Sequence, residues 1–196
     1  MQNVTLKLTA ESPILMHSDR YANPLDTMTK EHKLLTSKRK KVDEDHEAIA
    51  KSEWMGGLYY DDEHGPYMPG QNVKSALVGA AKIHRMGATF KRALIVVDDR
   101  LRLDYTGPRD PEKMWEIPRF VDCRSVVVGQ SRLMRYRPKF HDWSLSVNIV
   151  FSNEMIEQED VVRAAENAGM FIGIGDYRPE KGGAFGRFSV EVQSND

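Results

Sequence analysis

Two amphipathic helices separate runs of alternating apolar and polar residues, and this order constrains the fold most. Residues 4–9 alternate as a half-buried strand does. Residues 72–84 and 159–168 carry apolar side chains at helical spacing. Residues 121–128 and 144–151 are rich in β-branched residues, which is typical of central strands. The sequence therefore predicts helices that cover a sheet.

The order of these elements indicates one topology. A last strand is expected at residues 185–192, and a charged insertion occupies residues 17–52, after the first strand. Without the insertion the order is βαββαβ, the ferredoxin-like or RRM-like arrangement, in which a four-stranded antiparallel sheet carries two helices on one face. We expect residues 1–196 to form a single α+β domain of this kind.

The insertion differs in composition from the rest of the chain. A basic block at residues 38–41 is followed by an acidic block at residues 43–47, and large apolar residues are few. This pattern predicts an exposed helix or a mobile loop. The alternative is an arm that reaches a partner subunit or a nucleic acid. Further along, Gly169 is expected to end the second helix.

Composition excludes several classes of protein. No apolar run approaches the roughly 20 residues that span a bilayer, and the first residues lack the apolar run of a signal peptide. The single cysteine, Cys123, excludes an internal disulfide, so we expect a cytoplasmic protein with no membrane partner. The net charge of −1 argues against a uniformly basic nucleic-acid binder but permits a local basic groove.

The segment at residues 173–188, GIGDYRPEKGGAFGRF, combines glycines with basic residues. Glycine tolerates positive φ and permits close approach of a ligand, and arginine and lysine supply donors and positive charge. Such a loop suits a polyanion that lies close to the protein backbone. The alternative is a glycine-rich turn with solvated basic side chains.

Three segments, the opening TLKLTAESPILM, then PYMPGQNVKSAL and the glycine-rich loop, resemble motifs that occur in the same order in the RAMP superfamily, the RNA-binding backbone subunits of CRISPR effector complexes. PYMPGQNVKSAL, at residues 66–77, is similar to that superfamily's "IPGSSLKGAL" type of motif, although Ser75 stands where many members have glycine. The glycine-rich loop is the third motif, and the opening TLKLTAESPILM resembles the first strand and its loop. Chains of this small size that resemble the superfamily also occur among the proteins of phages and other mobile elements.

The resemblance implies that the chain binds single-stranded nucleic acid, RNA rather than DNA, and assembles side by side as a homo-oligomer or a ribonucleoprotein subunit. The glycine N–H groups would donate to phosphates together with the basic side chains. The implied binding residues are Lys74, Gly173, Gly175, Arg178, Lys181, Gly182, Gly183, Arg187, Arg135 and Arg137.

Two groups of residues extend this expected site. Arg132 is expected on the same strand face as Arg135 and Arg137, continuing the groove, unless these arginines only protect an edge strand from aggregation. Tyr177, Phe185 and Tyr136 are candidate base-stacking side chains, with Phe185 better suited to the core.

Signals for enzymatic chemistry are weaker. Neither a GxxxxGK[ST] phosphate loop nor an HExxH zinc motif occurs, and we assign no catalytic residue, metal ligand or cofactor. The oxygen-rich run from Asp61 to His64 suits either a divalent cation or a solvated turn. Asp19 and Asp26 lie where some RAMP subunits carry an RNA-cleaving aspartate, but no motif fixes the alignment.

A binding protein is thus favoured over an enzyme, and two alternatives remain open. One is a structural or interaction module of a virus or prophage that keeps the fold without binding nucleic acid. The other is a metal-dependent ribonuclease that uses carboxylates of the insertion.

Overall fold

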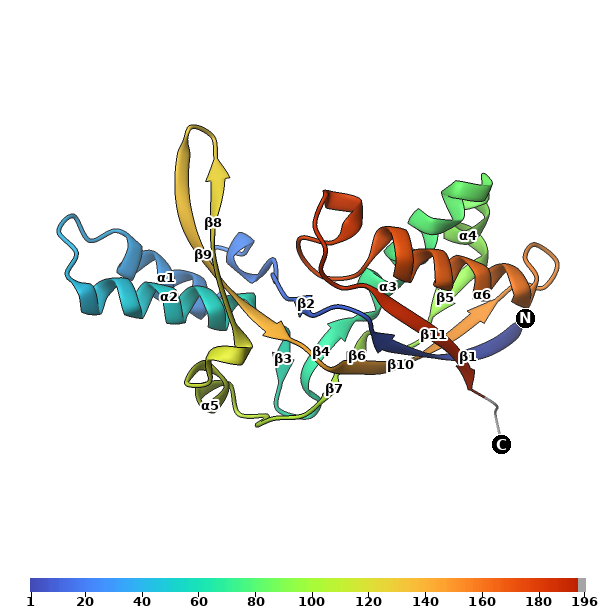
Figure 1. Cartoon of the computed structure of the whole chain (residues 1–196), viewed down its shortest axis with the longest axis horizontal. Coiled ribbons are helices and arrows are strands. Elements are labelled where there is room, and N and C mark those ends of the chain that lie inside the picture. Colours follow the sequence, from blue (N-terminus) through green and yellow to red (C-terminus); the bar gives the residue numbers. More distant parts are fainter. Residues whose placement is uncertain (194–196) are drawn as a thin grey trace. The chain divides into compact units, whose positions relative to one another are not determined.

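The computed structural model describes residues 1–193, except the side chain of residue 128, and confirms the α+β class (Figure 1). The chain forms two compact units, each built from separate segments. Unit 1 comprises Met1–Ile14, Tyr60–Thr106 and His141–Asp196, and unit 2 comprises Leu15–Tyr59 and Gly107–Phe140. The boundary near the start of the chain falls within the short strand β2 (Ile14–Leu15).

An antiparallel sheet forms the centre of unit 1. Its strands are β1 (Gln2–Ala10), β5 (Leu94–Val96), β10 (Trp143–Phe151) and β11 (Phe188–Gln193). They lie in the order β11-β1-β10-β5, and β7 (Asp104–Tyr105) also pairs with β10. The first and last strands are therefore direct neighbours, with Thr9 opposite Ser189.

Strand alternation divides the two faces of this sheet. On β1, Val4, Leu6 and Leu8 are buried, and they lie opposite the buried Ile149, Val147 and Leu145 of β10. Helices α3 (Gly70–Ala81) and α6 (Gln158–Asn167) contact each other, and they pack on β5 and β11 respectively. The apolar core lies between this helical layer and the sheet.

The helical layer includes several short elements. The 3₁₀ turn η2 (Lys82–His84) and helix α4 (Gly87–Ala93) follow α3. The prediction that Gly169 ends the second helix is wrong, because the π-helical turn η4 (Ala168–Ile172) continues α6 as far as Gly173. A β-carbon on Gly169 would lie 1.9 Å from the carbonyl oxygen of Phe188. Gly169 therefore permits close packing on β11.

A second, smaller sheet in unit 1 contains β3 (Tyr60–Asp61), β4 (Gly65–Pro69) and β6 (Arg100–Arg102), with β4 in the middle. α3 begins immediately after β4. A β-carbon on Gly70 would lie 2.1 Å from the carbonyl oxygen of Asp98, so this strand-to-helix junction requires glycine.

Unit 2 contains the charged insertion, which forms two helices. The 3₁₀ turn η1 (Arg20–Ala22) precedes α1 (Thr27–Thr36) and α2 (Asp43–Gly57). The later segment supplies α5 (Pro111–Trp115), the 3₁₀ turn η3 (Pro118–Phe120) and the hairpin of β8 (Val121–Val128) and β9 (Ser131–Phe140). The buried Trp54 of α2 donates its indole N–H to the carbonyl oxygen of Phe120 at 2.9 Å. This bond joins the two segments.

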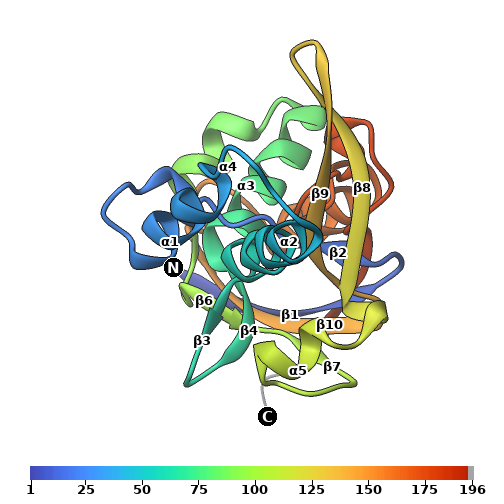
Figure 2. The same ribbon diagram turned by 90° about the vertical axis from the view of Figure 1, so that its left-hand side faces the viewer.

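The β8–β9 hairpin extends beyond the helices of unit 2 (Figure 1, Figure 2). The prediction of β8 as a central strand is wrong, because β8 pairs with β9 outside the main sheet. Val127 and Met134 keep 65% and 51% of their surface exposed. The β-branched run of β8 thus forms a strand without forming a core.

Candidate nucleic-acid interface

The glycine-rich loop between η4 and β11 folds back on itself, and its glycines make this possible. A β-carbon on Gly183 would lie 1.7 Å from the carbonyl oxygen of Tyr177, and one on Gly186 would lie 1.8 Å from that of Ile174. Real β-carbons do not approach backbone so closely, so no other residue fits without opening the loop. Gly175 and Gly182 have positive φ values of 80° and 76°. The glycines therefore serve the loop's own packing.

Most of the glycine N–H groups are already used by the chain. Those of Gly173, Gly182, Gly183 and Gly186 donate to backbone carbonyl oxygens at 2.7 to 3.0 Å. The expectation that these groups supply additional phosphate donors is wrong for these four glycines. Recognition of an anion by these four N–H groups is therefore not favoured, and the basic side chains of the loop are the better candidates.

The basic side chains of the loop differ in their surroundings. Arg178 donates to the carboxylate of Glu180 at 2.7 Å and to the carbonyl oxygen of Gly175 at 3.1 Å. Lys181 is exposed and makes no ion pair with any described residue. Local pairing thus neutralises Arg178 but leaves Lys181 available.

Arg187 sits at the end of the loop, just before β11. Its backbone N–H donates to Oγ of Ser12 at 2.9 Å, and its Nε is buried with no hydrogen-bond partner among the described residues. A buried, unsatisfied charged donor is costly.

Lys74 lies in the second turn of α3, half-exposed and without an ion pair among the described residues. It shares unit 1 with the loop, whereas Arg135 and Arg137 belong to unit 2. The predicted site residues therefore fall in two units.

The arginines of the β8–β9 hairpin occupy both of its faces. Arg135 and Arg137 lie on one face of β9, opposite Arg124 and Asp122 of β8. The expectation that Arg132 shares their face is wrong, because residues 132 and 135 are an odd number of positions apart on a strand. The hairpin therefore presents positive charge on both sides.

Ion pairs anchor part of this charge. Arg135 donates to Glu53 of α2 at 2.6 Å, and the backbone N–H of Tyr136 donates to the same carboxylate at 3.3 Å. The buried Asp122 accepts from Nε of Arg124 at 2.7 Å. Arg132 makes only a 3.5 Å contact with Ser125, so its charge is essentially unpaired.

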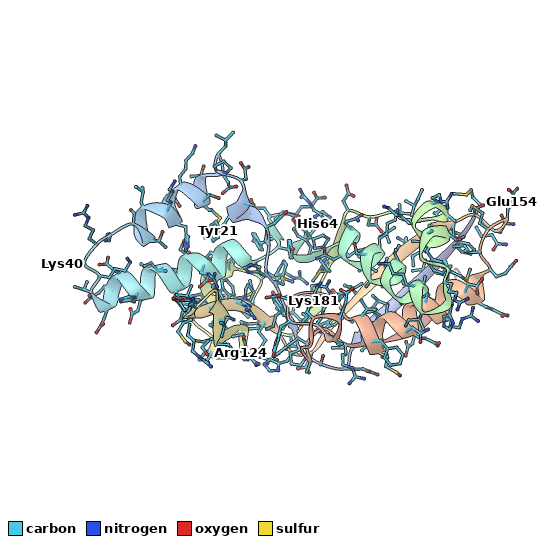
Figure 3. The ribbon with its side chains drawn as sticks, turned by 90° about the horizontal axis from the view of Figure 1, so that it is seen from above. Tyr21, Lys40, His64, Arg124, Glu154 and Lys181 are labelled. Atoms are coloured by element: carbon cyan, nitrogen blue, oxygen red, sulfur yellow. The ribbon has the colours of Figure 1, made fainter. Side chains whose placement is uncertain are left out.

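Formal charge is distributed unequally between the units. Unit 2 contains 16 Lys and Arg against 12 Asp and Glu, a charge of +4, whereas unit 1 contains 12 against 17, a charge of −5. The overall charge of −1 conceals this division. Part of the excess lies at the connection between α1 and α2, where Lys40 marks the free end of the helical pair (Figure 3).

The three candidate stacking side chains are placed differently. Phe185 is 9% exposed, in agreement with a core role. The ring of Tyr136 contacts Trp115 edge-on, with centroids 6.4 Å apart. Tyr177 remains 44% exposed. Of these three, Tyr177 is the most accessible to a base.

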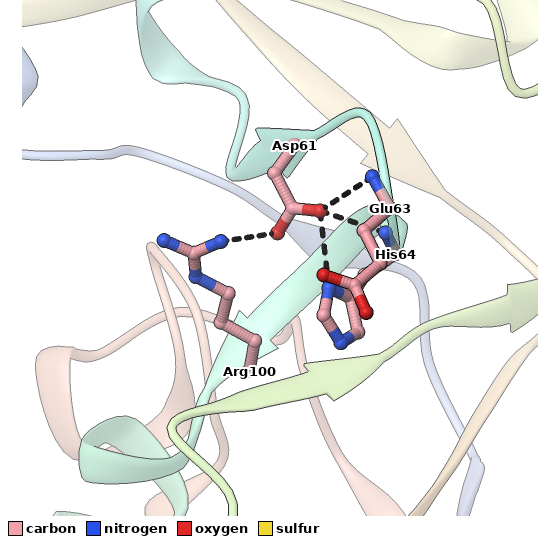
Figure 4. A network of polar contacts seen from close by, with 4 residues as sticks. All are labelled: Asp61, Glu63, His64 and Arg100. Carbon is pink, nitrogen blue, oxygen red and sulfur yellow. Dashed lines mark hydrogen bonds and ion pairs between the residues drawn. The ribbon is translucent and has the colours of Figure 1, made fainter.

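The Asp61–His64 run forms a compact turn (Figure 4). Oδ1 of Asp61 accepts from the backbone N–H groups of Glu63 and His64 at 2.9 and 2.7 Å, and it contacts Nδ1 of His64 at 3.0 Å. Oδ2 accepts from Arg100 at 2.9 Å. The His64 backbone bond, then the His64 side chain and Arg100, hold the pKa of Asp61 at about 2. The carboxylate stabilises the turn, and the described residues include no group of three or more potential metal ligands.

Sequence reasoning missed a polar cluster at the base of the α1–α2 pair. The Tyr21 ring stacks on His32 with centroids 4.5 Å apart, and its hydroxyl donates to the carbonyl oxygen of Ser52. Nδ1 of His32 lies 3.0 Å from Oγ of Ser52. Burial raises the pKa of Tyr21 and lowers the pKa of His32. No local motif signals this cluster, because its members are 11 to 31 positions apart.

Asp26 has a structural use. Its carboxylate caps α1 by accepting from the backbone N–H groups of Met28 and Thr29 at 2.9 and 3.3 Å. Such caps stabilise a helix start.

No family model matches the chain, and no curated protein matches its sequence. Within residues 1–193, no helix has both the length and the apolar character needed to cross a membrane.

Proposed function

We propose that the protein binds single-stranded nucleic acid through its phosphate backbone. The RAMP resemblance favours RNA over DNA and implies that copies assemble side by side along the strand. Exposed cations of the β8–β9 hairpin and of the glycine-rich loop would make the phosphate contacts.

The observation that carries this proposal is the charge of unit 2. Its +4 excess includes arginines on both faces of a hairpin that extends beyond the helices of that unit (Figure 2). Local potential, and not net charge, governs attraction of a polyanion. In unit 1, the exposed and unpaired Lys181 supports a second group of contacts.

We also propose that unit 1 has the ferredoxin-like topology. Counting β1, β5, β10 and β11 as strands one to four, the order β11-β1-β10-β5 reads 4-1-3-2, with α3 and α6 as the two crossover helices. This order supports the assignment.

The open face of that sheet is poorly suited to stacking on nucleic-acid bases. Apart from the apolar Val150 and Ile95, its side chains are small or polar, as the pairs Thr5–Asn148, Lys7–Ser146 and Thr9–Ser144 illustrate. β1, β5, β10 and β11 place no aromatic side chain on this face. Contacts to phosphate are therefore favoured over the aromatic platform that RRM modules use.

A salt titration of a labelled single-stranded oligonucleotide tests the proposal. We expect the single variants Arg132→Ala and Lys181→Ala each to bind more weakly and to flatten the plot of log K against log salt by ~0.7 units, the value for one lost contact. The loss is expected to be similar for different base sequences, because phosphate contacts carry no base information. Arg178→Ala is expected to have a smaller effect than Lys181→Ala, because Glu180 already pairs with Arg178.

The single variants Lys91→Ala and Arg92→Ala of α4 are the matched control, since each removes one exposed charge from an element other than the hairpin and the loop. An equal loss in the control would show a non-specific charge effect. Absence of wild-type binding at low salt would end the proposal and favour the structural module. Magnesium-dependent loss of labelled RNA, prevented by chelator, would support the ribonuclease.

A further inference from the structure

Tyr177 adopts a backbone conformation that residues other than glycine rarely take. Its φ is +50°, and Arg85 is the only other such residue in the described part of the chain. Positive φ is unfavourable for a residue with a β-carbon, and such strained residues cluster at functional sites.

The surrounding loop holds Tyr177 in this conformation. Its carbonyl oxygen accepts from the backbone N–H of Phe185 at 3.3 Å, and the next carbonyl, that of Arg178, accepts from Lys181 and Gly183 at 2.8 and 3.0 Å. A β-carbon on Gly183 would also lie 2.8 Å from Cγ of Tyr177. The missing side chain of Gly183 thus leaves room for the base of the tyrosine ring.

The ring is supported on one side and open elsewhere. The buried Phe185 lies beside it, with centroids 6.1 Å apart and planes inclined by 34°. Tyr177 nevertheless keeps 44% of its surface exposed. A purely structural role at a left-handed position would suit glycine or asparagine, so an exposed aromatic ring there requires another explanation.

We propose that Tyr177 stacks on an unpaired base of the bound strand and so selects single-stranded over duplex nucleic acid. This inference rests on the proposed function. The cation of Lys181, four residues along the same loop, would contact the adjacent phosphate. Stacking on an aromatic side chain requires a base that is free of its duplex neighbours.

Three variants and two oligonucleotides test the role of the ring. Tyr177→Ala is expected to weaken binding of a single strand by about tenfold, the lower part of the range for one stacked base. Its salt slope should equal that of the wild type, because no cation is lost. Tyr177→Trp should restore affinity, and an oligonucleotide of abasic sites should bind the wild type and Tyr177→Ala equally.

Phe171→Ala is the matched control, because Phe171 is another exposed aromatic residue of unit 1, and we expect it to bind as the wild type does. Tyr177→Gly relieves the strained φ, so a binding loss shared by Tyr177→Ala and Tyr177→Gly reflects the missing ring and not a disordered loop. If Tyr177→Ala binds as tightly as the wild type, the stacking proposal is wrong. It is also wrong if the substitution lowers affinity for the abasic strand as much as for the normal strand. In either case the proposal of phosphate binding stands. If the wild type binds no single strand, both proposals fail.

Discussion

The ring of Tyr21 lies so close to Gly56 of α2 that a β-carbon built on this glycine would fall 2.1 Å from Cζ of the ring. We expect Gly56→Ala to lower the free energy of unfolding by about 1–3 kcal/mol, as overpacking does. In an ordinary helix position the same change would stabilise by up to ~1 kcal/mol. Urea denaturation shows whether Gly56→Ala raises or lowers the free energy of unfolding.

The Tyr21→Ala background provides the control. Once the ring is removed, Gly56→Ala should become neutral or stabilising, so the two changes should be strongly non-additive. Additive effects would mean that the ring does not determine the need for glycine at this position.

His32 should make stability depend on pH. Burial lowers its folded pKa below the ordinary 6.5, so between the two pKa values the unfolded chain binds more protons than the folded one. The contribution of neutral His32 is therefore complete above about pH 6.5 and is lost as the pH falls below it. Comparison with His32→Phe, which keeps an aromatic ring on Tyr21, should show wild-type stability falling more steeply between pH 7 and 5. Parallel curves would contradict this.

Asp61 should also make stability depend on pH, but in a more acidic range than His32 does. Its folded pKa of about 2 lies below the ordinary 3.8, so the stability it contributes is present above about pH 4 and is lost as the pH falls towards 2. We expect Asp61→Asn to be less stable than the wild type at neutral pH, with the difference shrinking below pH 4. Asp62→Asn, at the exposed neighbouring position, should have little effect at neutral pH. Thermal melts across this range measure both.

Two adjacent glycines of the loop should respond differently to alanine. Gly183→Ala places a β-carbon 1.7 Å from a backbone oxygen. A β-carbon on Gly182 has no neighbour within 4 Å, so Gly182→Ala costs only the conformational strain of an alanine at positive φ. That conformational cost is roughly 1–2 kcal/mol. Limited trypsin digestion should therefore cleave after Lys181 faster in Gly183→Ala than in Gly182→Ala. Equal rates would mean that the loop accommodates the added carbon.

The sequence predicted well the elements that local pattern determines. Residues 121–128 were expected as a strand and form one with those bounds. The pattern could not reveal that this strand leaves its apolar side chains uncovered, because β-branched residues favour extended backbone whether or not a core covers them. The central strand at residues 144–151 is also rich in β-branched residues, but its alternate side chains are buried in the core of unit 1.

Interactions between distant segments were not predictable. The charged insertion was expected as an exposed helix or a mobile loop, and α1 is mostly exposed, but α2 buries Ala50, Trp54, Gly56 and Gly57. Its attachment through Trp54 depends on Phe120, 66 positions away. For the candidate site, the sequence identified the loop and its cations, but the closeness of Gly183 to Tyr177 and the pairing of Arg178 with Glu180 required coordinates.

The place of β1 in the sheet affects how the protein is made. β1 is synthesised long before both of its neighbours, β10 and β11. At about 5–20 residues per second, the ribosome needs on the order of 10 s to produce β10 after β1. During this interval Val4, Leu6 and Leu8 have no strand to pair with, so the nascent chain presents an aggregation-prone apolar segment that chaperones would have reason to bind.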